Sequence, residues 1–243
     1  MQPFSLSIAF GALTGLLLVG WQAPKKETLR YLDAGIITLF CALIGSRAFS
    51  VVSNITYYRL HPVEVFQVWS GGLSGIGAIV GGSVILILIS IWWKIPVGLL
   101  LDTLFPLAGA LTVTAWLGCG LDRCSYGLPS NAWWAVPSRD EWGILTGRVP
   151  VQLLGATLSL GVIWILERYS KKNPIEGMTA SLGLFSISSI LFSLSYLRAD
   201  PAYIWKGLRL DAWGAIALMI FWGIIVVVLL ARWKIKKLPY SHT

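Results

Sequence analysis

The chain has 243 residues, of which 56% are hydrophobic, only 12% are charged and thirteen are tryptophan. This composition is typical of a membrane protein and nearly excludes a soluble domain. A net charge of +8 would suggest a nucleic-acid partner in a soluble protein, but here the charges fall in short loops between apolar runs. Such charges indicate membrane topology and contacts with lipid headgroups, so no nucleic-acid partner is expected.

Seven stretches are apolar enough to cross the hydrocarbon of a bilayer, which takes about 20 residues of helix. They cover residues 4–21, 34–46, 73–93, 97–118, 150–166, 177–197 and 212–231, and the second is expected to extend through Val52. The first is long for a signal peptide and lacks both a basic n-region and an A-x-A site, so we expect a retained helix. The sequence therefore predicts an all-α integral membrane protein of about seven transmembrane helices, forming a single membrane-embedded domain over residues 1–243.

The basic residues predict the orientation, because cytoplasmic loops are enriched in lysine and arginine. With the N-terminus outside, the inner loops and tail hold eleven of the 19 basic residues, and eight of these eleven are lysines. This bias favours an N-out, C-in orientation with interfacial segments on the outer side. The outer set is Arg47, Arg59, Arg123, Arg139, Arg148, Arg198, Lys206 and Arg209.

Seven arginines on one side indicate a site for anionic lipid headgroups, because guanidinium binds phosphate through a planar fork of donors. The alternative is that they are ordinary loop charges, which we favour for Arg59 and Arg139. In that case their partners would be the nearby acids, Glu64, Asp122, Asp140, Glu141, Asp200 and Asp211.

Two outer segments have the aromatic composition of the membrane interface, residues 56–82 and 131–137. In the first, the spacing of Gly77 and Gly81 favours helix packing over ligand contact. His61 could titrate as a base but is more typical of an interfacial residue. Asp102, near the start of the fourth helix, is either functional or an N-terminal cap.

The sequence contains no common metal or cofactor motif. It has two histidines, no CxxC, HExxH or G-x-S-x-G pattern, no phosphate loop and no dinucleotide fingerprint, so neither a metal nor a cofactor is expected. Cys119 and Cys124 could form a disulfide or offer a nucleophilic thiol near Arg123, although we favour inert small residues. Cys41 is expected to be a small hydrophobic residue in a helix.

Five blocks carry a further signal in chain order: DAGIITLFCALIGSRAFSVV, YYRLHPVEVFQVWSGGLSGIGAIVGG, LGCGLDRCSYG, TGRVPVQLL and LRADP. Together, on a frame of seven helices, they resemble the prolipoprotein diacylglyceryl transferase family. The resemblance implies a bacterial plasma (inner) membrane protein that transfers diacylglycerol from phosphatidylglycerol to the lipobox cysteine of prolipoproteins. The implied partners are phosphatidylglycerol or another anionic phospholipid, the prolipoprotein signal peptide and the membrane.

The same blocks imply the residues of the site. Arg198 would bind the phosphate and Asp200 would orient an arginine or the headgroup, although a mutual loop salt bridge is the alternative for this pair. Substrate contacts are expected from Arg47, His61, Gly71, Gly72, Ser74, Gly118, Arg123, Tyr126, Gly127, Arg148 and Gln152. The chain departs from the family pattern at Ile76, Trp116, Cys119, Asp122 and Cys124, where the family has histidine, arginine, two asparagines and glutamate.

These departures leave open a second function, a catalytically inactive or repurposed lipid-binding relative of the family. A small transporter is disfavoured, because charged residues inside the predicted helices are almost absent and no helix broken at mid-depth is evident.

Overall fold

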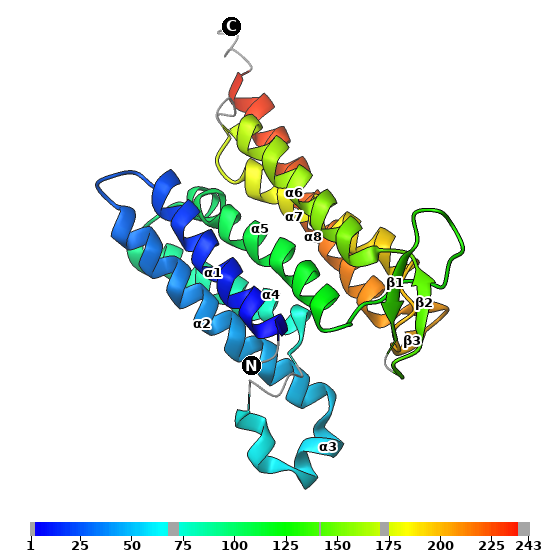
Figure 1. Ribbon diagram of the computed structural model, residues 1–243. Helices are drawn as coiled ribbons and strands as arrows, with labels where there is room; N and C mark the ends of the chain where they lie inside the picture. Colours follow the sequence, from blue (N-terminus) through cyan, green and yellow to red (C-terminus); the bar gives the residue numbers. More distant parts are fainter. Residues whose placement is uncertain (1–2, 68–72, 141, 171–174, 238–243) are drawn as a thin grey trace, which may run out of the picture. The chain divides into compact units, whose positions relative to one another are not determined.

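The computed structural model describes residues 3–67, 73–140, 142–170 and 175–237, and almost all of its regular structure is helical (Figure 1). The chain divides into two compact units, one formed by Met1–Gly15 with Ala108–Thr243 and the other by Leu16–Leu107. We call the first the outer-chain unit, because it holds both ends of the sequence, and the second the inner-chain unit, because it is an internal segment of the sequence. These names do not refer to the two sides of the membrane, and each unit is described by itself.

The helices agree with the stretches predicted from the apolar runs. They are α1 (Pro3–Gln22), α2 (Thr28–Ser53), α3 (Ile55–Leu60), the 3-10 helix η1 (Pro62–Phe66), α4 (Gly75–Trp93), α5 (Val97–Leu121), α6 (Val151–Ser170), α7 (Met178–Ser195) and α8 (Leu210–Lys237). Within the described residues, six of them are long and apolar enough to cross a membrane, while α4 contributes a shorter apolar stretch, Gly77–Trp93. The predicted helical membrane fold is confirmed.

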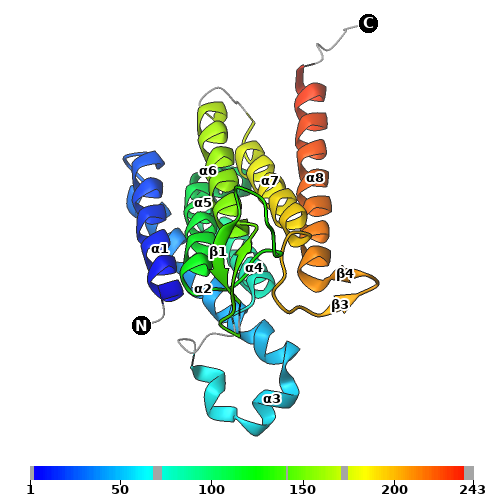
Figure 2. The same ribbon diagram turned by 45° about the vertical axis from the view of Figure 1, so that its right-hand side comes forward.

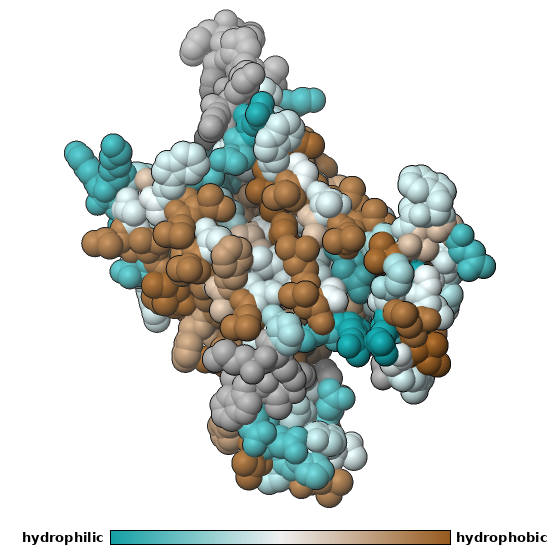
Figure 3. Space-filling model, in the orientation of Figure 1, coloured by the Kyte–Doolittle hydropathy of each residue, from teal (hydrophilic) through white to brown (hydrophobic). Residues whose placement is uncertain are grey.

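The helices carry apolar side chains on their outward faces. Leu17 is 66% exposed and Val227 is 65% exposed, and brown side chains cover much of the helical surface in Figure 3. A soluble protein does not leave so much contiguous apolar surface in water, whereas lipid tails accept it, and a helix satisfies its own backbone groups there.

In the inner-chain unit, α2 and α4 pack closely through glycines. A Cβ atom built on Gly77 would lie 2.9 Å from the Cα of Ser46, and one built on Gly81 would lie 3.1 Å from the Cα of Gly45. Glycine therefore lets the two backbones approach, as small-residue spacing does in membrane helices. The prediction that Gly77 and Gly81 serve helix packing is confirmed.

In the outer-chain unit, α7 packs between α6 and α8 (Figure 2). Where α6 and α7 meet α5, a core forms from Trp116, Val149, Val151, Ala156 and Leu194. The indole of Trp116 lies against the backbone of α6 at Gly155, where a Cβ atom would fall 2.8 Å from the indole Cγ. Trp116, at which the resemblance expects an arginine, is thus a packing residue.

Two short antiparallel hairpins link the helices of this unit. β1 (Val136–Arg139) pairs with β2 (Leu145–Arg148) between α5 and α6, and β3 (Ile204–Trp205) pairs with β4 (Leu208–Arg209) between α7 and α8. Figure 2 shows the second hairpin at the N-terminal end of α8. Both hairpins therefore sit at helix ends, where the polar residues of the candidate site are found.

Candidate functional site

Three loop segments of the outer-chain unit are joined by backbone hydrogen bonds at the helix ends. The amide of Leu128 donates to the carbonyl of Leu197 at 2.9 Å, and the amide of Ala199 donates to the carbonyl of Tyr126 at 2.8 Å. On the other side, the amide of Val149 donates to the carbonyl of Leu128 at 3.0 Å. The segments that carry Tyr126, Arg148 and Arg198 are therefore held in one small backbone frame.

Arg198 lies beside Asp200 in a two-pronged ion pair. Its Nε donates to Asp200 Oδ1 at 2.8 Å and its Nη2 donates to Asp200 Oδ2 at 2.6 Å. Its Nη1 donates to Asp211 Oδ2 at 2.8 Å. The salt bridge considered as an alternative for Arg198 and Asp200 is thus present, and it extends to a second acid.

Arg209 completes this group, and the sequence analysis had not included it among the site residues. Its Nη2 donates to Asp200 Oδ2 at 3.0 Å, its Nη1 donates to the Asp200 carbonyl at 2.7 Å, and its Nε donates to Asp211 Oδ1 at 3.2 Å. We call Arg198, Asp200, Arg209 and Asp211 the four-charge cluster. The local sequence LRLD carries no signal of this contact, which arises because the β4 strand and the first turn of α8 return the chain to Asp200.

Burial and charge act in opposite directions on this cluster. Burial by itself lowers the pKa of Arg198, but the hydrogen bond and charge of Asp200 and the charge of Asp211 outweigh burial and raise that pKa above its ordinary value. Burial likewise raises the pKa of Asp200, and the hydrogen bonds and charges of Arg198 and Arg209 outweigh it and lower that pKa. Arg198 and Asp200 are therefore both ionised at neutral pH.

Three members of the cluster, Arg198, Asp200 and Arg209, line a pocket of about 460 Å³. Its polar wall holds Arg198, Asp200 and Arg209, and its remaining lining is Ser195, Tyr196, Ala199, Pro201, Ala202, Ile204, Gly207, Leu208 and Ala212. The pocket combines two guanidinium groups with an apolar rim, next to the start of a helix long enough to span a membrane. This arrangement suits a molecule with an anionic group attached to an apolar body, once that group replaces a carboxylate that now accepts from the arginines.

Arg148 has a different environment in the same unit. It is buried, its Nη2 donates to Asp140 Oδ2 at 3.0 Å, its Nη1 donates to the Gly127 carbonyl at 3.2 Å, and its guanidinium lies 4.9 Å from the centre of the Tyr126 ring. Its Nε is buried with no partner among the described residues. Asp140 in turn accepts from the amides of the β1–β2 turn, so Arg148 ties that hairpin to the backbone frame.

The loop after α5 is closed by a disulfide between Cys119 and Cys124. The expectation of two inert small residues is therefore wrong, because the turn at Asp122 brings the two cysteines together at the helix end. Within this loop Arg123 is exposed and has a φ of +60°, and no hydrogen bond or ion pair of its guanidinium is found in the part of the chain that the structure describes. Gln152 donates to the Cys124 carbonyl at 3.0 Å and holds the loop against α6.

Two glycines of the predicted site serve close packing. A Cβ atom on Gly118 would lie 2.9 Å from the Cβ of Ser7 in α1, and one on Gly127 would lie 2.9 Å from the carbonyl carbon of Val149. Asp122 accepts from the amide of Phe4 at 2.9 Å, which caps the start of α1. In the outer-chain unit, Gly118 and Gly127 therefore allow close packing and Asp122 caps a helix.

Arg47, His61 and Ser74 belong to the inner-chain unit. Arg47 is buried, donates from Nε to the Val65 carbonyl at 2.9 Å and from Nη2 to the Glu64 carbonyl, and lies over the Tyr58 ring. It therefore holds η1 against the end of α2. Ser74 caps α4 by accepting from the amide of Gly77 at 3.3 Å. Gly71 and Gly72 lie outside the described residues.

His61 is exposed and stacks on Tyr57, with ring centres 4.8 Å apart, and its Nδ1 lies 3.8 Å from Glu64 Oε1. The Tyr57 hydroxyl donates to Glu64 Oε2 at 2.7 Å, and this hydrogen bond raises the pKa of Tyr57. The exposed aromatic surroundings agree with an interfacial position for His61. Whether it also touches substrate stays a prediction.

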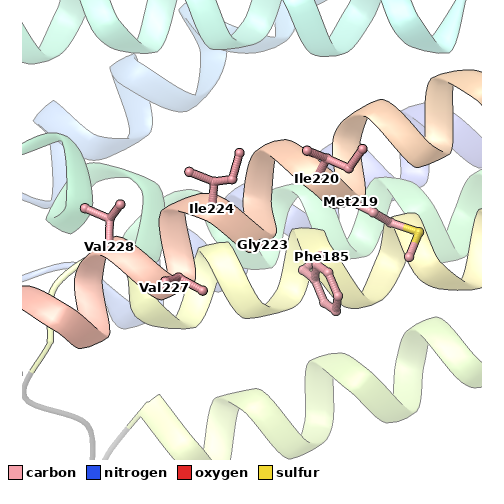
Figure 4. Close-up of a pocket in the computed structure, with 7 residues that line it drawn as sticks. All are labelled: Phe185, Met219, Ile220, Gly223, Ile224, Val227 and Val228. Atoms are coloured by element: carbon pink, nitrogen blue, oxygen red, sulfur yellow. The ribbon is translucent and has the colours of Figure 1, made fainter.

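A second hollow lies on the outward face of α7 and α8 and has a volume of about 460 Å³ (Figure 4). It is lined only by apolar residues, Phe185, Met219, Ile220, Gly223, Ile224, Val227 and Val228. A hollow of this composition within two apolar helices can hold a hydrocarbon chain but offers no group for chemistry. Among the described residues no group of three or more potential metal ligands is found.

The fold and the charged pocket define a multi-pass helical membrane protein with an arginine-lined site at its helix ends. The family model described as prolipoprotein diacylglyceryl transferase matches residues 1–229. The chain therefore belongs to the prolipoprotein diacylglyceryl transferase family, and the resemblance inferred from its five blocks is confirmed.

Curated relatives cover nearly the whole chain at low identity. A phosphatidylglycerol–prolipoprotein diacylglyceryl transferase of Streptococcus agalactiae serotype Ia is 26% identical over 233 residues, which is 93% of this chain and 90% of that protein. The protein of the same name from Streptococcus uberis is 26% identical, covering 98% of this chain and 93% of its own length. The one from Lactobacillus johnsonii is 23% identical, covering 96% and 87%.

Proposed function

We propose that this protein transfers a diacylglyceryl group from phosphatidylglycerol to the lipobox cysteine thiol of prolipoproteins. The observation that carries the proposal is the pocket in which Arg198 and Arg209 lie side by side next to the start of α8. The family and the names of its curated relatives support the same reaction. The proposal assigns the chain to the bacterial plasma membrane.

The pocket fits the headgroup end of such a lipid. Arg198 and Arg209 present several N–H donors, which suit the two free oxygens of a phosphodiester better than a single ammonium would. The apolar rim, which includes Tyr196 and Ile204, would accept the first carbons of the acyl chains. Asp200 receives donors from both arginines and would keep their planes oriented.

The reaction that this assigns to the site is a displacement at carbon. The cysteine sulfur forms a bond to the glycerol carbon of the diacylglyceryl group, the bond from that carbon to the phosphate oxygen breaks, and glycerol phosphate leaves with the electron pair. The thiol proton is released to solvent. Negative charge grows on the departing phosphate, so guanidinium groups that contact its oxygens stabilise the transition state more than the ground state.

The disulfide supports placing the pocket on the extracytoplasmic side of the membrane. Disulfides persist in oxidising compartments outside the cytoplasm, and Cys119–Cys124 closes the loop that follows α5. The hydrogen-bonded frame joins the segment just after this loop to the segment of Arg198. The N-out orientation predicted from the basic residues assigns these same segments to the outer face.

The test is lipidation of a reporter in cells depleted of their own transferase. Expression of the native chain should give a lipobox reporter its thioether-linked lipid, detected by mass spectrometry of the reporter's N-terminal cysteine. Arg198→Ala should abolish the product, whereas Arg59→Ala, which removes an exposed arginine of α3, should leave it unchanged. No lipidation by the native chain at normal expression would end this proposal, and equal loss in both variants would refute the placement of the site.

The alternative is a lipid-binding relative without the transfer reaction. It is favoured by one observation: a disulfide and a buried tryptophan occupy positions where the family resemblance expects polar groups, at Cys119, Cys124 and Trp116. The same reporter assay separates the two functions, because such a relative would bind the phospholipid without lipidating the reporter.

A further inference from the structure

The carboxylate of Asp211 lies between the two guanidinium groups of the pocket. Its Oδ2 accepts from Arg198 Nη1 at 2.8 Å, and its Oδ1 accepts from Arg209 Nε at 3.2 Å. Two oxygens that bridge two guanidinium groups are also the arrangement that a bound phosphate would adopt. Asp211 thus takes donors that an anionic ligand of these two arginines would use.

The two acids of the four-charge cluster are held unequally. The side chain of Asp200 is 15% exposed, and it receives three donors at 3.0 Å or less from Arg198 and Arg209. Arg209 also donates to the Asp200 main chain. The side chain of Asp211 is 38% exposed, and only one of its contacts with the arginines is shorter than 3.0 Å. Asp211 is therefore the acid that a ligand can displace.

The charge balance makes this displacement necessary. Arg198 and Arg209 carry two positive charges, and Asp200 and Asp211 carry two negative charges, so the cluster is neutral while both acids are in place. An incoming anion would gain no net attraction and would meet the Asp211 carboxylate at close range. If the Asp211 side chain turns out to solvent, one positive charge is left uncompensated. Arg198 Nη1 and Arg209 Nε, which now donate to Asp211, are then free to bind.

We propose that Arg198 and Arg209 form a phosphate-binding site that Asp211 occupies as a built-in competing anion, and that a phosphate ester binds by displacing this carboxylate. Asp200 remains in place as the acid that holds both guanidinium planes. Asp211 lies in the first turn of α8, two residues after the end of β4, so its side chain can rotate outward without breaking a helix. The identity of the ester as a lipid headgroup rests on the proposed function, whereas the displaceable carboxylate does not.

The competing carboxylate of Asp211 would increase the selectivity of the site for its ligand. A ligand that offers one or two strong acceptor oxygens can replace Asp211, whereas a neutral headgroup or a weak acceptor cannot. The site would thus reject most lipids that reach the pocket along the bilayer and accept those whose phosphate is sterically open. Arg209 becomes a second binding residue, in a chain where Trp116 stands at a position that has arginine in the family pattern.

The test measures binding of glycerol phosphate to the purified full chain in detergent by isothermal titration. Asp211→Asn keeps the size of the side chain and its capacity to accept from the Ala212 amide but removes the competing charge. We expect it to bind glycerol phosphate about tenfold more tightly than the native chain, a change of about 1.4 kcal/mol. Asp211→Glu keeps a carboxylate and is the matched control, which should show no gain.

Further variants and probes separate the possible outcomes. Arg209→Gln, combined with Asp211→Asn, should lose the gained affinity, and unchanged elution and circular dichroism would show that each variant is folded. Unchanged binding in folded Asp211→Asn would overturn the proposal. Inorganic phosphate and nanodiscs of phosphatidylglycerol or phosphatidylcholine distinguish a free phosphate ligand from a lipid headgroup. If the Asp211 effect is present but no reporter is lipidated, the anion site stands and the proposed transferase function fails.

Discussion

The buried pair of Arg148 and Asp140 allows a quantitative prediction about stability. Both side chains are less than 8% exposed, and Arg148 Nη2 lies 3.0 Å from Asp140 Oδ2. Asp140→Asn removes the negative charge, but the amide oxygen can still accept from the turn amides of Trp142 and Ile144. The change therefore isolates the loss of charge from the loss of the turn.

The expected magnitude follows from the burial of the remaining charge. Breaking a buried ion pair by removing one partner costs about 3–5 kcal/mol. Arg148 keeps the Gly127 carbonyl and its position over the Tyr126 ring, so its charge is not left without any partner and the cost falls at the lower end of that range. We therefore expect Asp140→Asn to lower the free energy of unfolding by about 3 kcal/mol.

The assay is reversible unfolding of the chain in mixed micelles with rising SDS, followed by circular dichroism. Combining Asp140→Asn with Arg148→Met removes both charges, and the double variant should be more stable than the sum of the single changes predicts, by about 2 kcal/mol. Arg139→Ala, on the exposed face of β1, is the control and should change stability by less than about 0.5 kcal/mol. A loss below about 1 kcal/mol in Asp140→Asn, or additive single changes, would refute the reasoning.

Three further outcomes are expected. The folded pKa of Asp200 lies below its ordinary value of 3.8, so the stability contributed by this carboxylate is complete above pH 3.8 and is lost as the pH falls through the folded pKa. In an acid titration of stability, Asp200→Asn should lack this loss. Identical curves of unfolding free energy against pH for the native chain and the variant would contradict the prediction. Gly81→Val forces a side chain into the facing backbone of α2 and should cost about 2 kcal/mol, measured by the same SDS unfolding, whereas an unchanged midpoint would argue against close α2–α4 packing. Thiol labelling of the denatured chain should modify only Cys41 before reduction and all three cysteines after it. Three reactive thiols without reductant would mean that the disulfide does not form. Cys119→Ala, which removes the disulfide to Cys124, should lower the free energy of unfolding by about 2 kcal/mol.

The positions of the membrane helices could be predicted from the sequence without knowledge of the tertiary structure. Apolar runs such as 97–118 and 212–231 lie within helices α5 and α8. A membrane helix makes its hydrogen bonds within one segment, so its existence depends on local composition and length. The glycine spacing at Gly77 and Gly81 likewise predicted a close helix contact, because small residues at that interval leave room for a neighbouring backbone whichever helix supplies it.

The composition of the candidate site was only partly accessible from the sequence. Arg198 and Asp200 are two residues apart in the chain, and their ion pair could be anticipated as one of two alternatives. Arg209 and Asp211 reach the same charged cluster only because the β3–β4 hairpin reverses the chain. Nothing in the local sequence of LRLD indicates the distance to Asp200, since that distance depends on how the hairpin folds back.

The sequence by itself determined that this is a helical membrane protein of a particular family, because both conclusions depend on composition and on the order of short blocks. Only the tertiary structure decided that Cys119 and Cys124 are bonded, that Arg148 is committed to Asp140, and that Asp211 shares two arginines with Asp200. Each of these facts is a distance between side chains from different turns or loops. Such distances depend on where the chain reverses, which residue types and their spacing do not specify.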